Sequence, residues 1–160
     1  MSILLETLYN EISDSHEVAL LTESCFDQSV NWMHMVEIKE FAYLLHGGEL
    51  IFNSGVNFTS PEWLKAFIDE LITAEASGLI IATKNFDLFT PEIIEYCNRI
   101  HFPLFSASWN TSFLEIMRQL SEILLSADQT SAVLTTALKN AIYFPTDYKS
   151  YVPHFERSNY

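Results

Sequence analysis

An imidazole and two carboxylates lie close together in the first third of the chain, at His34, Glu37 and Glu49. A histidine near a carboxylate can transfer protons, so these side chains could act as a general acid and base. If residues 32–38 form a strand, however, His34 and Glu37 point to opposite faces of it. The alternative is structural. Trp32 then packs in the core and His34 bonds a backbone carbonyl, while Glu37 or Glu49 caps a turn.

Polar residues also follow three of the strands that we expect, in the stretches 53–55, 83–85 and 106–110. Open α/β sheets bind ligands beyond the carboxyl ends of their strands. Converging amides and hydroxyls there could hydrogen-bond a small polar molecule, with helix N-terminal amides assisting if it is anionic. The alternative is that these are ordinary turn and cap residues. Lys84 alone supplies too little charge to indicate a phosphorylated ligand.

These two groups define the candidate ligand-binding residues, which are His34, Glu37, Gly48, Glu49, Asn53, Ser54, Gly55, Asn85, Ser106 and Ser108. The sequence lacks a phosphate-binding loop, a dinucleotide fingerprint, a nucleophile elbow and a zinc-protease motif. Its histidines are scattered, so a transition metal would need ligands from distant segments. We therefore predict no catalytic residue, no metal and no cofactor, and an enzyme that uses His34 is the minor hypothesis.

The elements that must position these residues follow a regular alternation. Apolar periodicity and Gly/Pro punctuation predict a helix at 2–12, a strand at 17–21, an extended segment at 30–38 and a helical turn at 40–46. From residue 49 the pattern is βαβαβα, with strands at 50–53, 79–83 and 104–106 and helices at 61–76, 91–101 and 112–125. Ser60, Thr90 and Ser112 stand at the helix starts as capping residues. A further helix could cover 132–141.

Short, almost continuous apolar strands such as 79–82 are typical of a parallel sheet covered on both faces. The predicted fold class is therefore α/β, with three layers and a mainly parallel sheet to which the N-terminal strands add antiparallel or mixed pairing.

The charge of the chain excludes some partners. Its formal net charge is −13, and residues 1–127 carry 5 Lys and Arg against 18 Asp and Glu. Such a surface repels phosphate backbones and anionic lipids, so we expect neither nucleic acid nor membrane contact by this region. There is no leader-like N-terminus and no long apolar run, and Cys25 and Cys97 have no C-x-x-C spacing. These features predict a cytoplasmic protein with two buried free thiols.

Several uncommon short motifs occur in order along the chain. They are Trp-Met-His at 32–34 with Glu37, Gly-Gly-Glu-Leu-Ile at 47–51, Ser-Gly at 54–55, Gly-Leu-Ile-Ile at 78–81, Pro-Glu-Ile-Ile at 91–94, and Phe-Pro-Leu at 102–104 before Phe113 and Ile116. Together they resemble the N-terminal domain of PucR-type (purine catabolism regulator) transcriptional regulators over roughly residues 4–126.

The resemblance implies a domain that controls a DNA-binding helix-turn-helix located far C-terminal to it. No such motif occurs here, so we expect the chain to be part of a longer regulator, with residues 1–126 as the regulatory domain and 127–160 as a linker helix and the start of the next segment. The family domain is also similar in pattern to the N-terminal domain of HPr kinase/phosphorylase. One departure is Phe52-Asn53-Ser54, where the family usually has Leu-Thr-Thr, so the effector can differ.

The sequence leaves two functions open. One is a sensory module that binds a small effector, such as a purine catabolite or another polar metabolite, and shifts the state of an attached DNA-binding domain. The other is a purely structural dimerisation or partner-docking module without a ligand, whose interface would be the helix 112–125 or the aromatic tail. A homodimer is expected in either case.

Overall fold

The computed structural model describes residues 2–143. Residues Ser2–Ser121 form one compact unit, and the last helix, α4 (Phe113–Tyr143), continues from it into a second unit that begins at Glu122. The two helices expected at 112–125 and 132–141 are thus one continuous helix. The segment expected to start the next domain, from residue 144 onward, lies outside the described residues.

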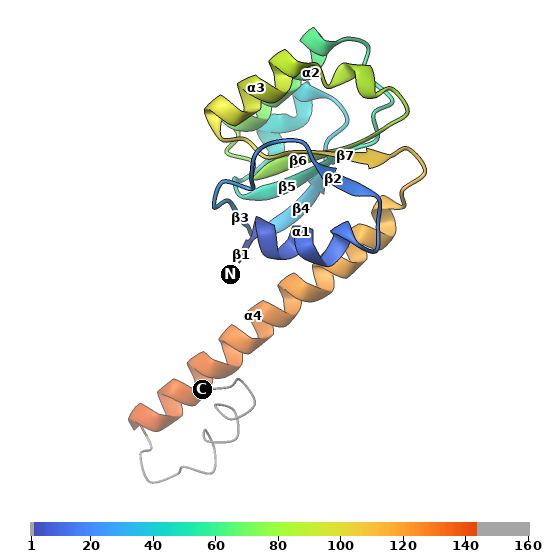
Figure 1. The fold of residues 1–160 in the computed structure, drawn as a ribbon. Coiled ribbons are helices and arrows are strands. Elements are labelled where there is room, and N and C mark those ends of the chain that lie inside the picture. Colours follow the sequence, from blue (N-terminus) through green and yellow to red (C-terminus); the bar gives the residue numbers. More distant parts are fainter. Residues whose placement is uncertain (1, 144–160) are drawn as a thin grey trace. The chain divides into compact units, whose positions relative to one another are not determined.

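A five-stranded mixed sheet forms the centre of the first unit (Figure 1). Its order is β2 (Val18–Leu20), β7 (Leu104–Ser108), β6 (Gly78–Thr83), β5 (Glu49–Asn53) and β4 (Trp32–Met35). Strands β4 to β7 are parallel, and β2 pairs antiparallel with β7. All residues of β5 and β6 are buried, which explains their apolar runs. The predicted fold class is confirmed.

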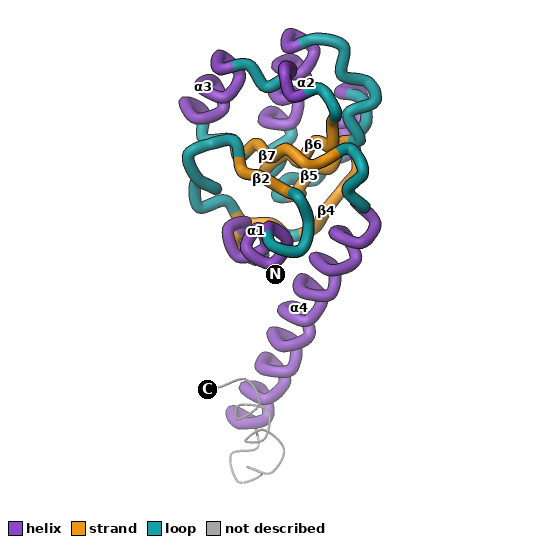
Figure 2. The backbone as a smooth tube through the Cα atoms, turned by 45° about the vertical axis from the view of Figure 1, so that its right-hand side comes forward, coloured by secondary structure: helices purple, strands orange, loops and turns teal. Residues whose placement is uncertain are grey.

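Helices cover both faces of this sheet (Figure 2). On one face lie α2 (Pro61–Thr73), α3 (Pro91–Ile100) and the 3₁₀ helix η1 (Lys39–Leu44). On the other lie α1 (Leu5–Ser13) and the first turns of α4, where Phe113 meets Phe52 of β5 with ring centroids 5.1 Å apart. The core between the sheet and α2/α3 consists of Val36, Ala42, Ile51, Leu64, Phe67, Ile68, Leu71, Ala76, Leu79, Ile81, Ile93, Cys97, Phe102 and Leu104.

The helices begin where their capping residues predict. Ser60 Oγ accepts a hydrogen bond from the Trp63 amide at 3.2 Å, and Thr90 Oγ1 accepts one from the Ile93 amide at 3.3 Å. Ser112 Oγ does the same for Glu115 at 3.3 Å. Each cap satisfies an amide that has no partner within its own helix.

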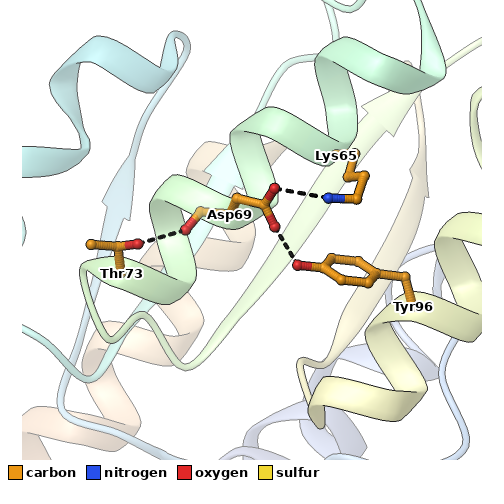
Figure 3. Close-up of polar contacts among 4 residues, drawn as sticks. All are labelled: Lys65, Asp69, Thr73 and Tyr96. Atoms are coloured by element: carbon orange, nitrogen blue, oxygen red, sulfur yellow. Dashed lines mark hydrogen bonds and ion pairs between the residues drawn. The ribbon is translucent and has the colours of Figure 1, made fainter.

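A polar contact joins the two helices α2 and α3 (Figure 3). Asp69 of α2 accepts hydrogen bonds from Lys65 Nζ, at 3.0 Å, and from the Tyr96 hydroxyl of α3. This hydrogen bond, together with burial, raises the pKa of Tyr96 to about 12. Lys65 Nζ also lies 4.4 Å above the Tyr96 ring. We refer to these residues as the α2–α3 clamp.

Two short elements were not predicted. Strands β1 (Ile3–Leu4) and β3 (Ser29–Val30) form a separate antiparallel pair, and η2 (Phe86–Leu88) is a single 3₁₀ turn. Elements of two or three residues are too short to show a periodicity. The β1–β3 pair ties the start of α1 to the end of the loop that follows β2.

The alternation predicted for 32–38 is observed, but the predicted packing of Trp32 in the core is wrong. Met33 points into the core at 3% exposure, whereas Trp32 is 44% exposed and so does not pack in the core. Val36 belongs to the core beneath α2 and α3, and Met33 does not, so the two side chains lie on opposite faces of the sheet, as regular alternation requires. Trp32 and His34 lie on the edge strand β4, whose side chains are covered less completely than those of the neighbouring strands β5 and β6.

Candidate ligand-binding site

The structure divides the candidate residues between the two ends of the sheet. Gly48 and Glu49 lie where β5 begins, and Ser54 and Gly55 lie where it ends. A five-residue strand separates its ends by about 13 Å, so these residues cannot contact one small molecule together. His34 lies in the middle of the edge strand β4. Its side chain is exposed and forms no hydrogen bond inside residues 2–143, so the carbonyl bond expected for it is absent there.

At the amino end of β5, the Glu49 carboxylate closes a turn. Oε1 accepts a hydrogen bond from the His46 amide at 2.7 Å, and Oε2 accepts one from the Gly47 amide at 2.9 Å. The residue is only 7% exposed. Gly48 donates its amide to Glu75 O at 2.8 Å. The turn-capping alternative is confirmed for Glu49, since both of its oxygens are already bonded to the backbone.

At the carboxyl end, Glu37 reaches across from the segment after β4. Its Oε1 accepts from the Ser54 amide at 3.1 Å, and its Oε2 accepts from Ser54 Oγ at 2.8 Å. The fully buried Asn53 side chain donates to Val36 O at 2.8 Å and accepts from the Gly55 amide at 2.7 Å. This network fixes the turn that follows β5.

Gly55 has a packing role in this turn. Its φ is +75°, in the left-handed region, and a Cβ placed there would lie 2.1 Å from Ala82 O on β6. Only glycine permits so close an approach of the two backbones. The turn is therefore held against the end of the neighbouring strand.

An open groove of about 460 Å³ lies beyond these strand ends. Its walls come from the turns after β5 and β6 and from the residue after β7. The lining residues are Ser54, Gly55, Val56, Phe58, Ala82, Thr83, Lys84, Asn85, Leu88 and Trp109. Three of the predicted site residues, Ser54, Gly55 and Asn85, thus meet in one place. We call it the carboxyl-end groove.

Lys84 and Trp109 give this groove its chemical character. Lys84 Nζ lies 3.7 Å from the centroid of the Trp109 ring, which is a cation–π contact. Both side chains are exposed. No carboxylate lines the groove, although the chain is strongly acidic. The sequence interpretation did not select these two residues; each comes directly after a strand of the parallel sheet, which is the signal that could have identified them.

Ser106 and Ser108 do not line the carboxyl-end groove. They lie with Phe86, Glu17 and Val18 around a different depression of about 480 Å³ beside β2 and β7. Ser108 Oγ donates to Asn110 Oδ1 at 2.5 Å within its own turn. Ser106 pairs with Ala19 of β2, and the Ser108 amide donates to Glu17 O at 3.3 Å, so both serines lie beside the β2 segment as well as beside β6.

The first unit is thus a three-layer α/β domain with an open groove at its parallel strand ends, the place at which open α/β sheets bind ligands. The sequence profile of the purine catabolism regulatory protein-like (PucR) family matches residues 11–124. The chain belongs to this family, which is one of regulatory proteins. No curated protein and no solved structure matches it significantly, so the expected likeness to HPr kinase/phosphorylase stays a prediction. Among the described helices, none has the length and apolarity needed to cross a membrane.

Proposed function

We propose that the first unit is the effector-sensing domain of a transcriptional regulator and that a small planar, polar metabolite binds in the carboxyl-end groove. The observation that carries this proposal is the pairing of Lys84 with Trp109 beside the Ser54 hydroxyl. A cation, an aromatic face and a hydroxyl are the groups that recognise a flat molecule with oxygen acceptors.

The Lys84–Trp109 contact also suggests how such a ligand enters. In the free protein the cation covers the indole face, 3.7 Å from its centroid. A planar ligand would replace the ammonium group on Trp109, and Lys84 would then pair with an electronegative oxygen of the ligand. The family name makes purine catabolites the first compounds to consider.

Control of an attached domain requires that the effector bind one state of the protein better than the other. A hundredfold preference corresponds to about 2.7 kcal/mol of shift in that equilibrium. The loops that line the groove are suited to this because each follows a different strand, so one ligand can contact several of them. We propose that their rearrangement on binding is the signal, and that the protein acts in the cytoplasm.

The direct test is titration of the purified chain with xanthine, hypoxanthine, urate and allantoin, followed by calorimetry and tryptophan fluorescence. We expect saturable binding of at least one compound, weakened about tenfold or more by Lys84→Met. Lys39→Met is the matched control, because Lys39 lies on η1, outside the groove. Absence of saturable binding, or equal affinity in Lys84→Met, would contradict the proposal.

The second candidate function is a dimerisation module. Strand β4 and η1 carry five large apolar side chains that are 44–77% exposed, namely Trp32, Met35, Phe41, Tyr43 and Leu44. Strand β4 also forms an edge of the sheet, and exposed edges promote pairing between chains. Sedimentation over a dilution series tests this candidate. Dimers of the wild type that become monomers in Trp32→Ser would support it, and monomers of the wild type at every concentration would exclude it.

A further inference from the structure

A second pocket lies at the opposite end of the sheet from the carboxyl-end groove. Its volume is about 380 Å³, and it is bounded by α1, by the loop between β2 and β3, and by His101 after α3. Strand β2 runs antiparallel to β7, so this loop emerges at the amino ends of the parallel strands. None of the candidate residues chosen from the sequence lines this pocket. We call it the α1 pocket.

The loop that forms one wall is held in an unusual backbone conformation. Phe26 and Asp27 have φ values of +51° and +58°, and His101 opposite them has +59°. Local bonds maintain this geometry: Ser24 Oγ accepts from the Phe26 amide at 3.1 Å, and the Phe26 ring stacks on His101 with centroids 5.0 Å apart. The β1–β3 pair then anchors the end of the loop to α1. These contacts together hold the wall in its observed conformation.

Aliphatic and aromatic side chains form part of the lining of the α1 pocket, beside polar ones such as Asn10 and Gln28. Leu4, Leu20, Tyr9 and Phe26 contribute to it, and the hydroxyl of Tyr9 accepts a hydrogen bond from the Leu20 amide at 3.3 Å. Cys25 belongs to the same lining and is only 6% exposed. Burial and then the nearby Glu6 carboxylate raise the pKa of Cys25 to about 11, so the thiol stays neutral and does not act as a nucleophile.

The rim carries negative charge without a counter-ion. Glu6 and Asp27 are both exposed, and neither carboxylate forms a hydrogen bond or ion pair with the described part of the chain. No Lys or Arg lines the pocket. The carboxylates do not make a metal site either, since residues 2–143 contain no converging group of three metal-ligating side chains. The pocket therefore combines aliphatic and aromatic side chains with an anionic rim.

We propose that the α1 pocket binds a small organic cation, an amine whose apolar body lies against the aromatic rings and whose ammonium group pairs with Glu6 and Asp27. Aromatic faces also attract ammonium groups, so Tyr9 and Phe26 reinforce the preference for a cation. An anion of the same shape is repelled. This site is independent of the groove, and its occupant differs in charge from the one proposed there.

The test uses three probes of similar shape, which are 2-phenylethylamine, 2-phenylethanol and 3-phenylpropionate. We expect the amine to bind about tenfold more tightly than the neutral alcohol, the scale expected for two partly exposed ion pairs, and the anion to bind least. The double variant Glu6→Gln, Asp27→Asn should lower the affinity for the amine to that for the alcohol. Amide chemical shifts should move at Phe26 and His101.

Two controls keep this result specific. Glu11→Gln removes a carboxylate from the same helix, outside the pocket, and should leave amine binding unchanged. Lys84→Met should also leave it unchanged, which separates this site from the carboxyl-end groove. Equal affinity for the amine and the alcohol, unchanged amine binding in the double variant, or no saturable binding to the folded chain would each overturn the proposal.

Discussion

The two ends of strand β5 use similar residues for different purposes. At the amino end, the buried Glu49 carboxylate bonds two backbone amides of its own turn. At the carboxyl end, Glu37 bonds one amide and one hydroxyl of Ser54, and that hydroxyl lies on the wall of an open groove. The first end is a closed turn, in which the carboxylate is used up by backbone bonds. The second end is a groove wall that a carboxylate holds in place from behind. The residue types alone do not distinguish them; the partners of each oxygen do.

The largest effect that we predict is for glycine replacement at the carboxyl end. Gly55→Ala should destabilise the protein by about 3 kcal/mol, because its Cβ would meet Ala82 O at 2.1 Å and because φ is +75°. Gly48→Ala at the amino end has a similar φ of +80°, but its Cβ would meet only the Asn31 side chain, which can move. We expect about 1 kcal/mol there.

Urea unfolding of the two alanine variants measures this difference. The two free energies of unfolding show which of the two turns is fixed by contact between backbones. If Gly48→Ala is the more damaging change, the closed turn is the more rigid of the two ends and our assignment is wrong.

Neutralising each carboxylate should also have a different effect on stability at the two ends. Glu49→Gln should cost about 2 kcal/mol, because a glutamine offers one oxygen and an NH₂ group where two backbone amides need acceptors. Glu37→Gln should cost about 1 kcal/mol. Its oxygen can accept from the Ser54 amide, and the Ser54 hydroxyl can reverse its role and accept from the new NH₂ group.

Chemical denaturation near neutral pH provides the two values. Ser54→Ala in the Glu37→Gln background is the control, because it removes the hydroxyl whose reversal limits the loss. Equal costs at Glu37 and Glu49 would mean that the hydroxyl does not adapt and that the two ends are equally closed.

The α2–α3 clamp belongs to neither end and supplies a reference of known chemistry. Tyr96→Phe should cost about 1 kcal/mol at pH 8, as it removes one hydrogen bond to the Asp69 carboxylate. That bond raises the pKa of Tyr96 from 10 to about 12. A raised folded-state pKa adds stability that is complete below pH 10 and is lost as pH rises from 10 to about 12.

Denaturation curves at several pH values between about 8 and 11.5 should therefore converge for the wild type and Tyr96→Phe as pH rises. Tyr43→Phe is the control, because Tyr43 is 77% exposed and its hydroxyl has no hydrogen bond in the part of the chain that the structure describes. A constant gap between the wild type and Tyr96→Phe across this range would contradict the assigned pKa.

The order of elements in the fold could be predicted from the sequence because it depends on local signals. Ser60, Thr90 and Ser112 mark three helix starts through their own hydroxyls. The buried strands β5 and β6 are recognisable as apolar runs. The exposure of Trp32 was not predictable, since it depends on the place of β4 at the edge of the sheet, which only tertiary structure decides. The β1–β3 pair likewise exists only through tertiary contact.

The candidate site was predictable in part. Ser54, Gly55 and Asn85 follow strands, and the rule for open sheets places them together in the carboxyl-end groove. Gly48 and Glu49 are neighbours of Ser54 in sequence, but an extended strand carries them to the other end. Ser106 lies beside a different depression, because its neighbours depend on the order of strands in the sheet, which is not encoded in local pattern.

The smallest effect on stability should come from the residues most important for the proposed function. Lys84→Met should change the free energy of unfolding by no more than about 0.5 kcal/mol, since Lys84 is exposed and its contact with the Trp109 ring is at the surface. The same change should weaken effector binding about tenfold or more. Denaturation and titration of one preparation measure both. A large loss of stability would mean that the Lys84–Trp109 contact has a structural role at this end of the sheet, as the Glu49 carboxylate has at the other end. A small loss with intact binding would remove Lys84 from the binding surface.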